Sequence, residues 1–223
     1  MRPLSLTLAA LALLTSAARA QVQAGACLPL DGVGCWYAPE GTPSDAPLLV
    51  YLRGHHPSLG PNVPAAQALT SARQAFTAYD LGKTASDKKV VVLVTYRSGL
   101  GVTTDDVSAL SAAAKRVFSK TIVAAHSGGY VGLGKTLDAG LAPARIVMLD
   151  NFYDAGGLAT RLQRLISAGA ACSGFYTPHN KKNFDAGYRK TVSCAVDDLA
   201  SDSQHNPAVG RCLGGYLDGR SCR

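Results

Sequence analysis

Continuous apolar runs recur along the chain and predict strands. They are apolar at successive positions rather than at alternate ones, which is typical of strands buried on both faces of a parallel sheet. We predict such strands at residues 46–53, 89–96, 120–125, 145–150 and 171–177, and a sixth at 191–196.

Segments with a helical pattern lie between and after these strands. The predicted helix at residues 104–118 opens with Thr103 and Thr104 followed by Asp105 and Asp106, which is an N-terminal capping signature. The alternation of strands and helices predicts a three-layer α/β fold with a mostly parallel central sheet, helices on both faces and right-handed crossovers. The predicted helices cover residues 64–79, 104–118, the segment after Ser127, 158–167 and 206–216.

The first twenty residues have the features of a secretory signal peptide. Arg2 gives a positive start, residues 4–14 are apolar, and Ala18-Arg19-Ala20 fits a cleavage site between small residues. The apolar part is shorter than the roughly 20 residues that span a bilayer, and no later segment is long and apolar enough. We therefore expect a secreted or periplasmic chain without stable membrane insertion. Residues 21–223 are expected to form a single domain and a monomer.

All six cysteines lie in the mature part, and an even number in an exported chain indicates disulfides. Six cysteines allow fifteen pairings, and the sequence does not select one. Closeness along the chain suggests Cys27–Cys35, Cys172–Cys194 and Cys212–Cys222. Zinc is the weaker interpretation, because the sequence has no C-x-x-C and no H-x₃₋₅-H pair. Residues 21–42 show no helical pattern and are expected to supply antiparallel edge strands tied by the first pair.

The charge pattern gives little support for a nucleic-acid partner. The formal net charge of +7 falls to +5 without Arg2 and Arg19. The remaining basic residues are scattered, apart from Lys181-Lys182, and no basic run has interleaved aromatic residues. A mild attraction to anionic surfaces or polymers is all that the charge predicts.

The third predicted strand ends in the segment Ala125-His126-Ser127-Gly128-Gly129. In a doubly wound sheet, ligands bind beyond the carboxyl ends of the strands, where Ser127 lies. The segment resembles the nucleophile elbow G-x-S-x-G, with alanine in the first glycine position. A sharp turn from strand to helix brings the residues two before and two after the serine together, so both must be small.

The segment after Ser127 contains two further glycines, Gly132 and Gly134. Each costs an ordinary helix about 1 kcal/mol relative to alanine. Their presence predicts a helix that packs very close to the sheet. The simpler alternative is a loop built from turn residues.

With this turn, the mature chain resembles the α/β-hydrolase fold family over nearly all of its length. The resemblance implies a Ser–acid–His triad in that order along the chain, and an oxyanion hole of backbone N–H groups. It implies the Gly128 amide as one donor. The second donor would come from Arg53-Gly54-His55-His56, which resembles the family's His-Gly loop; we select the His55 amide, with His56 as the alternative.

The order of the triad requires a histidine after the serine, which removes His55 and His56. His126 directly precedes Ser127, and on an elbow its ring should point away from the hydroxyl. His179 follows the fifth strand, where the family more often has its acid. His205 lies before the last helix, where the family's histidine resembles it best. We select His205, with His179 as its competitor.

The acid is harder to assign, because residues 177–180, after the fifth strand, contain no carboxylate. Asp150 ends the fourth strand, and Asp150-Asn151-Phe152-Tyr153 resembles a branch of small hydrolases with an acid there. We select Asp150, and a structural carboxylate is its alternative role. The remaining candidate acids are Asp197 and Asp198, which a cutinase-like enzyme would use, and Asp202.

Together these residues predict an exported serine hydrolase that acts on small soluble or polymer-borne carboxylic esters and needs no metal or organic cofactor. The short segment between Asp150 and Leu158 leaves little room for a lid, so an open site is expected. The triad does not separate esters from amides, which leaves an amidase or peptidase possible. A non-catalytic exported binding protein with the same fold is the alternative from another class, and the missing carboxylate after the fifth strand favours it.

Overall fold

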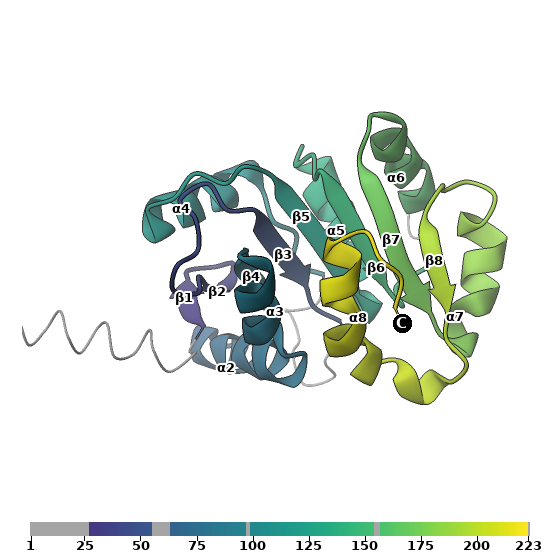
Figure 1. The fold of residues 1–223 in the computed structure, drawn as a ribbon, viewed down its shortest axis with the longest axis horizontal. Helices are drawn as coiled ribbons and strands as arrows, with labels where there is room; N and C mark the ends of the chain where they lie inside the picture. The colour runs from purple at the N-terminus through teal and green to yellow at the C-terminus, as the bar shows by residue number, and fades with distance from the viewer. Residues whose placement is uncertain (1–26, 55–62, 97–98, 154–156, 223) are drawn as a thin grey trace, which may run out of the picture.

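The computed structural model describes residues 27–54, 63–96, 99–153 and 157–222. The predicted signal peptide, the predicted oxyanion donor His55 and its alternative His56 lie outside these residues. The described chain is an α/β fold around one eight-stranded sheet with the strand order β1-β2-β4-β3-β5-β6-β7-β8 (Figure 1). The predicted α/β class is confirmed.

The sheet is mostly parallel, as predicted. The pairs β1–β2 and β2–β4 are antiparallel, and the other adjacent pairs are parallel. The expected N-terminal edge strands are therefore present, whereas the last strand begins four residues later than predicted. The strands are β1 (Leu28–Leu30), β2 (Gly34–Tyr37), β3 (Leu48–Leu52), β4 (Val91–Thr95), β5 (Thr121–His126), β6 (Arg145–Leu149), β7 (Ala171–Tyr176) and β8 (Ala195–Asp198).

Seven α-helices lie within the described residues. Two of them, α3 and α7, were not predicted from the sequence, because they are short and one is largely polar. The helices are α2 (Ala65–Ala78), α3 (Leu81–Lys88), α4 (Thr104–Ala114), α5 (Tyr130–Asp138), α6 (Leu158–Ser167), α7 (Pro178–Asn183) and α8 (Pro207–Leu217).

The ends of α4 show which part of the helix prediction was correct. Thr103 is the N-cap: its hydroxyl accepts a hydrogen bond from the Asp106 amide at 3.1 Å, and its own amide donates to the Asp106 carboxylate at 2.8 Å. This confirms the capping signature. The helix ends at Ala114, before the predicted residue 118, because Lys115 adopts a left-handed conformation with φ 52°.

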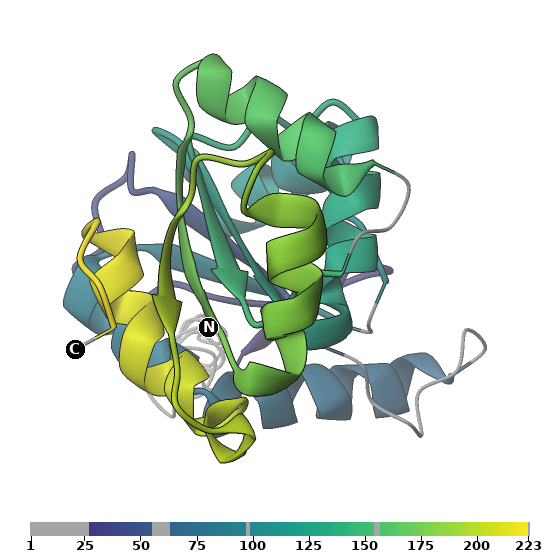
Figure 2. The same cartoon turned by 90° about the vertical axis from the view of Figure 1, so that its right-hand side faces the viewer.

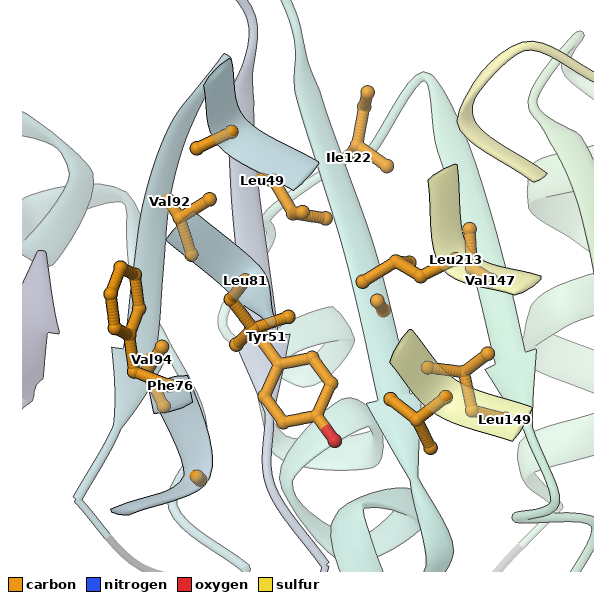
Figure 3. Close-up of a cluster of buried hydrophobic side chains, with 14 of the residues drawn as sticks. Leu49, Tyr51, Phe76, Leu81, Val92, Val94, Ile122, Val147, Leu149 and Leu213 are labelled. Atoms are coloured by element: carbon orange, nitrogen blue, oxygen red, sulfur yellow. The ribbon is translucent and has the colours of Figure 1, made fainter. Parts of the chain in front are cut away.

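Two hydrophobic clusters pack against the sheet, because alternate side chains of a strand point to opposite faces. Leu49 and Tyr51 of β3 belong to one cluster, together with residues of α2, α3 and α8 (Figure 3). Leu48 and Val50 belong to the other, together with residues of α4, α5 and α6. Figure 2 shows α8 and α6 separated by the sheet. The continuous apolar runs are thus explained by strands that are buried throughout.

Three disulfides join Cys27 to Cys35, Cys172 to Cys194 and Cys212 to Cys222, as closeness along the chain suggested. In the part of the chain that the structure describes, no cysteine is free and no group of His, Cys, Asp and Glu could hold a metal ion. Likewise, none of the described helices has the length and apolar character that crossing a membrane requires.

Candidate active site

Ser127 lies directly after the buried strand β5 and begins a short 3₁₀ turn that leads into α5. Its φ is +50°, a left-handed conformation that residues other than glycine seldom adopt. This is the sharp strand–turn–helix arrangement expected from the sequence. Strain of this kind persists only where the surrounding structure holds it.

Two glycines make room for the turn. A Cβ atom on Gly129 would lie 2.4 Å from the carbonyl oxygen of Leu52, at the end of β3. A Cβ atom on Gly54 would lie 2.9 Å from the Cβ of Ser127. Neither position accepts a side chain without a shift of the backbone or of the serine itself. The two neighbouring strand ends therefore close tightly on the serine.

Gly132 and Gly134 were predicted to let the helix pack very close to the sheet, but the structure gives a different reason for them. A Cβ atom on Gly132 would lie 2.5 Å from the carbonyl oxygen of Leu100, in the segment before α4. A Cβ atom on Gly134 would lie 3.3 Å from the guanidinium of Arg161, on α6. Close packing on the sheet is therefore a property of Gly129, whereas these two glycines accommodate neighbouring parts of the chain.

His205 and Asp150, which are far apart in the sequence, are in direct contact. His205 follows a 3₁₀ turn (Asp202–Gln204) and precedes α8, and Asp150 follows the last residue of β6. The His205 Nδ1 lies 2.6 Å from the Asp150 Oδ2. Asp150 is almost completely buried, with 1% of its surface exposed, whereas 29% of the His205 side chain is exposed. The imidazole is thus anchored on one side and accessible on the other.

Thr177 and Asn180 hold the Asp150 carboxylate from the end of β7. The amide and hydroxyl of Thr177 donate to the carboxylate at 2.9 and 2.7 Å, and the Asn180 amide group donates to it at 2.9 Å. Burial by itself raises the pKa of Asp150, but the hydrogen bonds from His205, Thr177 and Asn180 outweigh it, so the pKa is lowered. The segment in which a carboxylate was missing therefore supplies donors to the carboxylate of the neighbouring strand.

The other candidate acids are engaged elsewhere. Asp197 accepts hydrogen bonds from the Tyr216 hydroxyl at 2.8 Å and from the Cys222 amide at 2.6 Å, which ties down the C-terminal segment.

Asp198 lies 3.7 Å from the Lys181 ammonium group. Asp202 accepts from the His179 amide at 2.7 Å. Of the four carboxylates considered, Asp150 is the one in contact with His205.

Ser127 and His205 line the same cavity, which has a volume of about 270 Å³. His126, Arg53 and Tyr79 also line it, whereas His179 does not. The cavity lies at the carboxyl ends of β3 and β5, where a doubly wound sheet binds its ligands. Ser127 and His205 thus line one cavity, and Asp150, which is not part of its described lining, contacts His205.

His126 is a buried neighbour of His205. Its ring centroid lies 4.7 Å from that of His205 and 5.1 Å from that of Tyr79. Neither ring nitrogen makes a hydrogen bond of normal geometry within the described residues. Burial, and then the nearby His205, lower the pKa of His126 to about 3. The ring is therefore neutral at physiological pH and packs beside the imidazole of His205.

Arg53 was not predicted to take part in the site. It was named only as the first residue of the loop expected to supply the second oxyanion donor. Only 6% of its surface is exposed, although it lines the cavity. An arginine that ends an otherwise apolar strand was the available signal, because such a strand end lies at the ligand-binding edge of the sheet.

The chain was compared with profiles of known protein families and with curated proteins, and neither comparison found a match.

Proposed function

We propose that this protein is an exported serine hydrolase with an α/β-hydrolase type of site, acting on carboxylic esters. The observation that carries the proposal is the contact between His205 Nδ1 and Asp150 at 2.6 Å, together with the lining of one cavity by both His205 and Ser127, whose φ is +50°. A nucleophile, a base and an acid that orients the base are the three parts that acyl transfer requires.

The ionised state of Asp150 sets the direction of proton transfer. Its lowered pKa keeps the carboxylate charged, so it accepts a hydrogen bond and His205 Nδ1 carries the proton. The other ring nitrogen, Nε2, is then a base. In the proposed reaction it takes the Ser127 proton as the hydroxyl oxygen attacks the ester carbonyl, and it later protonates the leaving alcohol.

The remaining steps follow from the same arrangement. Asp150 stabilises the imidazolium that forms, and the amides of Gly128 and His55 are the proposed donors to the tetrahedral oxyanion. A water molecule activated by His205 then releases the acyl group and restores the serine. The exposed part of His205 gives this water access. The chemistry needs no metal or organic cofactor.

The hydrogen bonds around Asp150 favour an enzyme over a non-catalytic binding protein. The absence of a carboxylate after β7 was the feature that favoured a binding protein. Thr177 and Asn180 at that position now hold Asp150 against His205. A held carboxylate that contacts a partly exposed imidazole on the cavity wall is the arrangement that a serine hydrolase requires, and it supports the enzyme.

The test is hydrolysis of 4-nitrophenyl acetate, butyrate and octanoate, with a 4-nitroanilide to examine amides. We expect the wild type to hydrolyse the short esters, and Ser127→Ala and His205→Ala to lower kcat/KM by at least about 10³-fold. Ser108→Ala is the matched control, because this exposed serine bonds only within α4. A wild type no more active than Ser127→Ala on all these substrates would favour the binding protein instead.

A further inference from the structure

Arg53 is a buried cation on the wall of the cavity that contains Ser127. Its Nη1 donates to the hydroxyl of Ser71 and, at 3.0 Å, to the carbonyl oxygen of Tyr96. Both acceptors are neutral, so they satisfy hydrogen bonds without balancing the charge. A buried cation usually has an anionic partner, because removing a charge from water is costly.

The described part of the chain supplies no such partner. None of its ion pairs includes Arg53. The described lining of the cavity contains no Asp or Glu, and the Arg53 Nε is buried without a hydrogen bond. Burial lowers the pKa of Arg53, because removing the charged guanidinium from water is costly. A guanidinium nevertheless stays protonated at neutral pH. Among the described residues, the lining of the cavity therefore holds one positive charge without an anionic partner.

Arg53 is also close to the proposed reacting groups. It directly precedes Gly54, whose backbone closes on Ser127. Its positive charge contributes to the lowered pKa of His126, the ring beside His205. A ligand that pairs with Arg53 would therefore lie within a cavity of about 270 Å³ together with the serine.

We propose that Arg53 binds a carboxylate of the substrate, so that the preferred substrates are half-esters: esters that keep one free carboxylate. This inference rests on the proposed hydrolase function. The single unbalanced charge matches a monoanion better than a phosphate dianion, and arginine pairs with carboxylates through charge-assisted hydrogen bonds. An ester bond placed on Ser127 with its carboxylate on Arg53 would be held at two points in the cavity.

Two activated esters with the same five-carbon acyl chain test the proposal. One is 4-nitrophenyl pentanoate, which is neutral, and the other is mono-4-nitrophenyl glutarate, which ends in a carboxylate. For the wild type we expect a kcat/KM about ten- to a hundredfold higher on the glutarate ester, the range of a charge-assisted hydrogen bond. This comparison needs no variant and is independent of whether any substitution disturbs folding.

The variants assign the preference to Arg53. Arg53→Gln should remove it, mainly by lowering kcat/KM for the glutarate ester, and Arg53→Lys should retain part of it because the charge remains. Arg145→Gln is the matched control: Arg145 also donates to a backbone carbonyl, that of Tyr216 at 3.0 Å, at the start of β6 and away from the cavity. It should leave the preference unchanged.

Failure of this inference can be told apart from failure of the proposed function. Pentanoate hydrolysis without a glutarate preference, or a preference that survives in Arg53→Gln, would overturn the inference alone. Binding of monomethyl glutarate to Ser127→Ala, measured by calorimetry, gives a readout without hydrolysis. We expect the additional Arg53→Gln change to weaken this binding at least about tenfold. Equal binding by the two proteins, or none by either, would overturn the carboxylate site.

Discussion

Ser127 and Lys115 have almost the same positive φ, 50° and 52°, but very different surroundings. Lys115 is exposed and ends helix α4, where a left-handed residue is a common way to stop a helix. Ser127 follows a fully buried strand end, the backbone of Gly54 closes on it, and Gly129 in the same turn packs against the end of β3. The same local strain ends a helix in one place and presents a hydroxyl to a cavity in the other.

The other residues with this conformation fall into the same two groups. Asp80 and Lys89 flank helix α3, so they belong with Lys115. Asp150, with φ 50°, follows β6 and belongs with Ser127. A residue with positive φ therefore does not by itself indicate a functional site. It points to a site when it follows a buried parallel strand, because that edge of the sheet is where ligands bind.

For the two residues that follow buried parallel strands, Ser127 and Asp150, the substitution Asp150→Asn should give the largest effect on activity. The side chain keeps its size, but an amide no longer accepts fully from His205 Nδ1, so the wrong tautomer is favoured and the imidazolium loses its stabilising charge. We expect kcat to fall by about 10²–10⁴-fold in ester hydrolysis. Asp197→Asn is the control, since that carboxylate bonds to Tyr216 and Cys222. If the Asp197 variant loses activity and the Asp150 variant keeps it, the acid has been assigned to the wrong residue.

Gly129→Ala tests how firmly the serine turn is held. The added Cβ would lie 2.4 Å from the backbone oxygen of Leu52, which cannot move without β3. We expect a loss of about 3 kcal/mol in the free energy of unfolding, measured with denaturant. In Gly214→Ala on α8, the Cβ meets only the end of the Lys88 side chain at 3.3 Å, and the variant should be neutral or more stable. Equal effects in both would mean that the turn is loosely packed.

His126, the buried residue before Ser127, should make stability depend on pH. Its pKa is about 3 in the folded protein, against an ordinary value of 6.5. Between these values the unfolded chain binds a proton that the folded protein does not. Stability therefore falls as the pH is lowered from 6.5 towards 3, by up to about 1.4 kcal/mol per pH unit.

The His126→Leu variant should have a shallower dependence than the wild type when unfolding free energies are measured between pH 6 and 4. His179→Leu, at an exposed position, is the control and should follow the wild type. Parallel curves for the wild type and the His126 variant would show that this histidine does not titrate differently in the two states.

Glycine substitutions at the two compared residues should give the smallest change in stability. Lys115→Gly and Ser127→Gly both relieve a left-handed residue, and we expect each to gain about 0.5–1 kcal/mol. Only Ser127→Gly should abolish ester hydrolysis. A loss of stability in Ser127→Gly would mean that the serine side chain, rather than its backbone, holds the turn.

The fold was largely predictable because its strands are buried along their whole length. Runs such as residues 89–96 indicate a parallel sheet without further information, and the capping signature at Thr103 indicates where α4 begins. Helices α3 and α7 were missed because a short polar helix has too few apolar positions to show a period. The end of α4 was missed because a lysine, the residue type at position 115, does not indicate a left-handed backbone.

The candidate site was predictable only in part. Ser127 is marked by its local sequence, since Gly129, two residues later, leaves no room for a side chain against the end of β3. The contact of His205 with Asp150 depends on packing between distant segments, which the sequence suggests only through a resemblance. The support from Thr177 and Asn180 depends on which groups meet in three dimensions, and so does the lack of an anionic partner for Arg53 among the described residues. Neither was visible in the sequence.

The most direct test of the central claim is to treat the protein with a fluorophosphonate and locate the adduct by mass spectrometry. The tryptic peptide of residues 121–135 contains Ser127 as its only serine. We predict one adduct per chain, on this residue, which is absent in Ser127→Ala and forms much more slowly in His205→Ala. A wild type that stays unmodified, or an adduct on another peptide, would contradict the claim that Ser127 is an activated nucleophile.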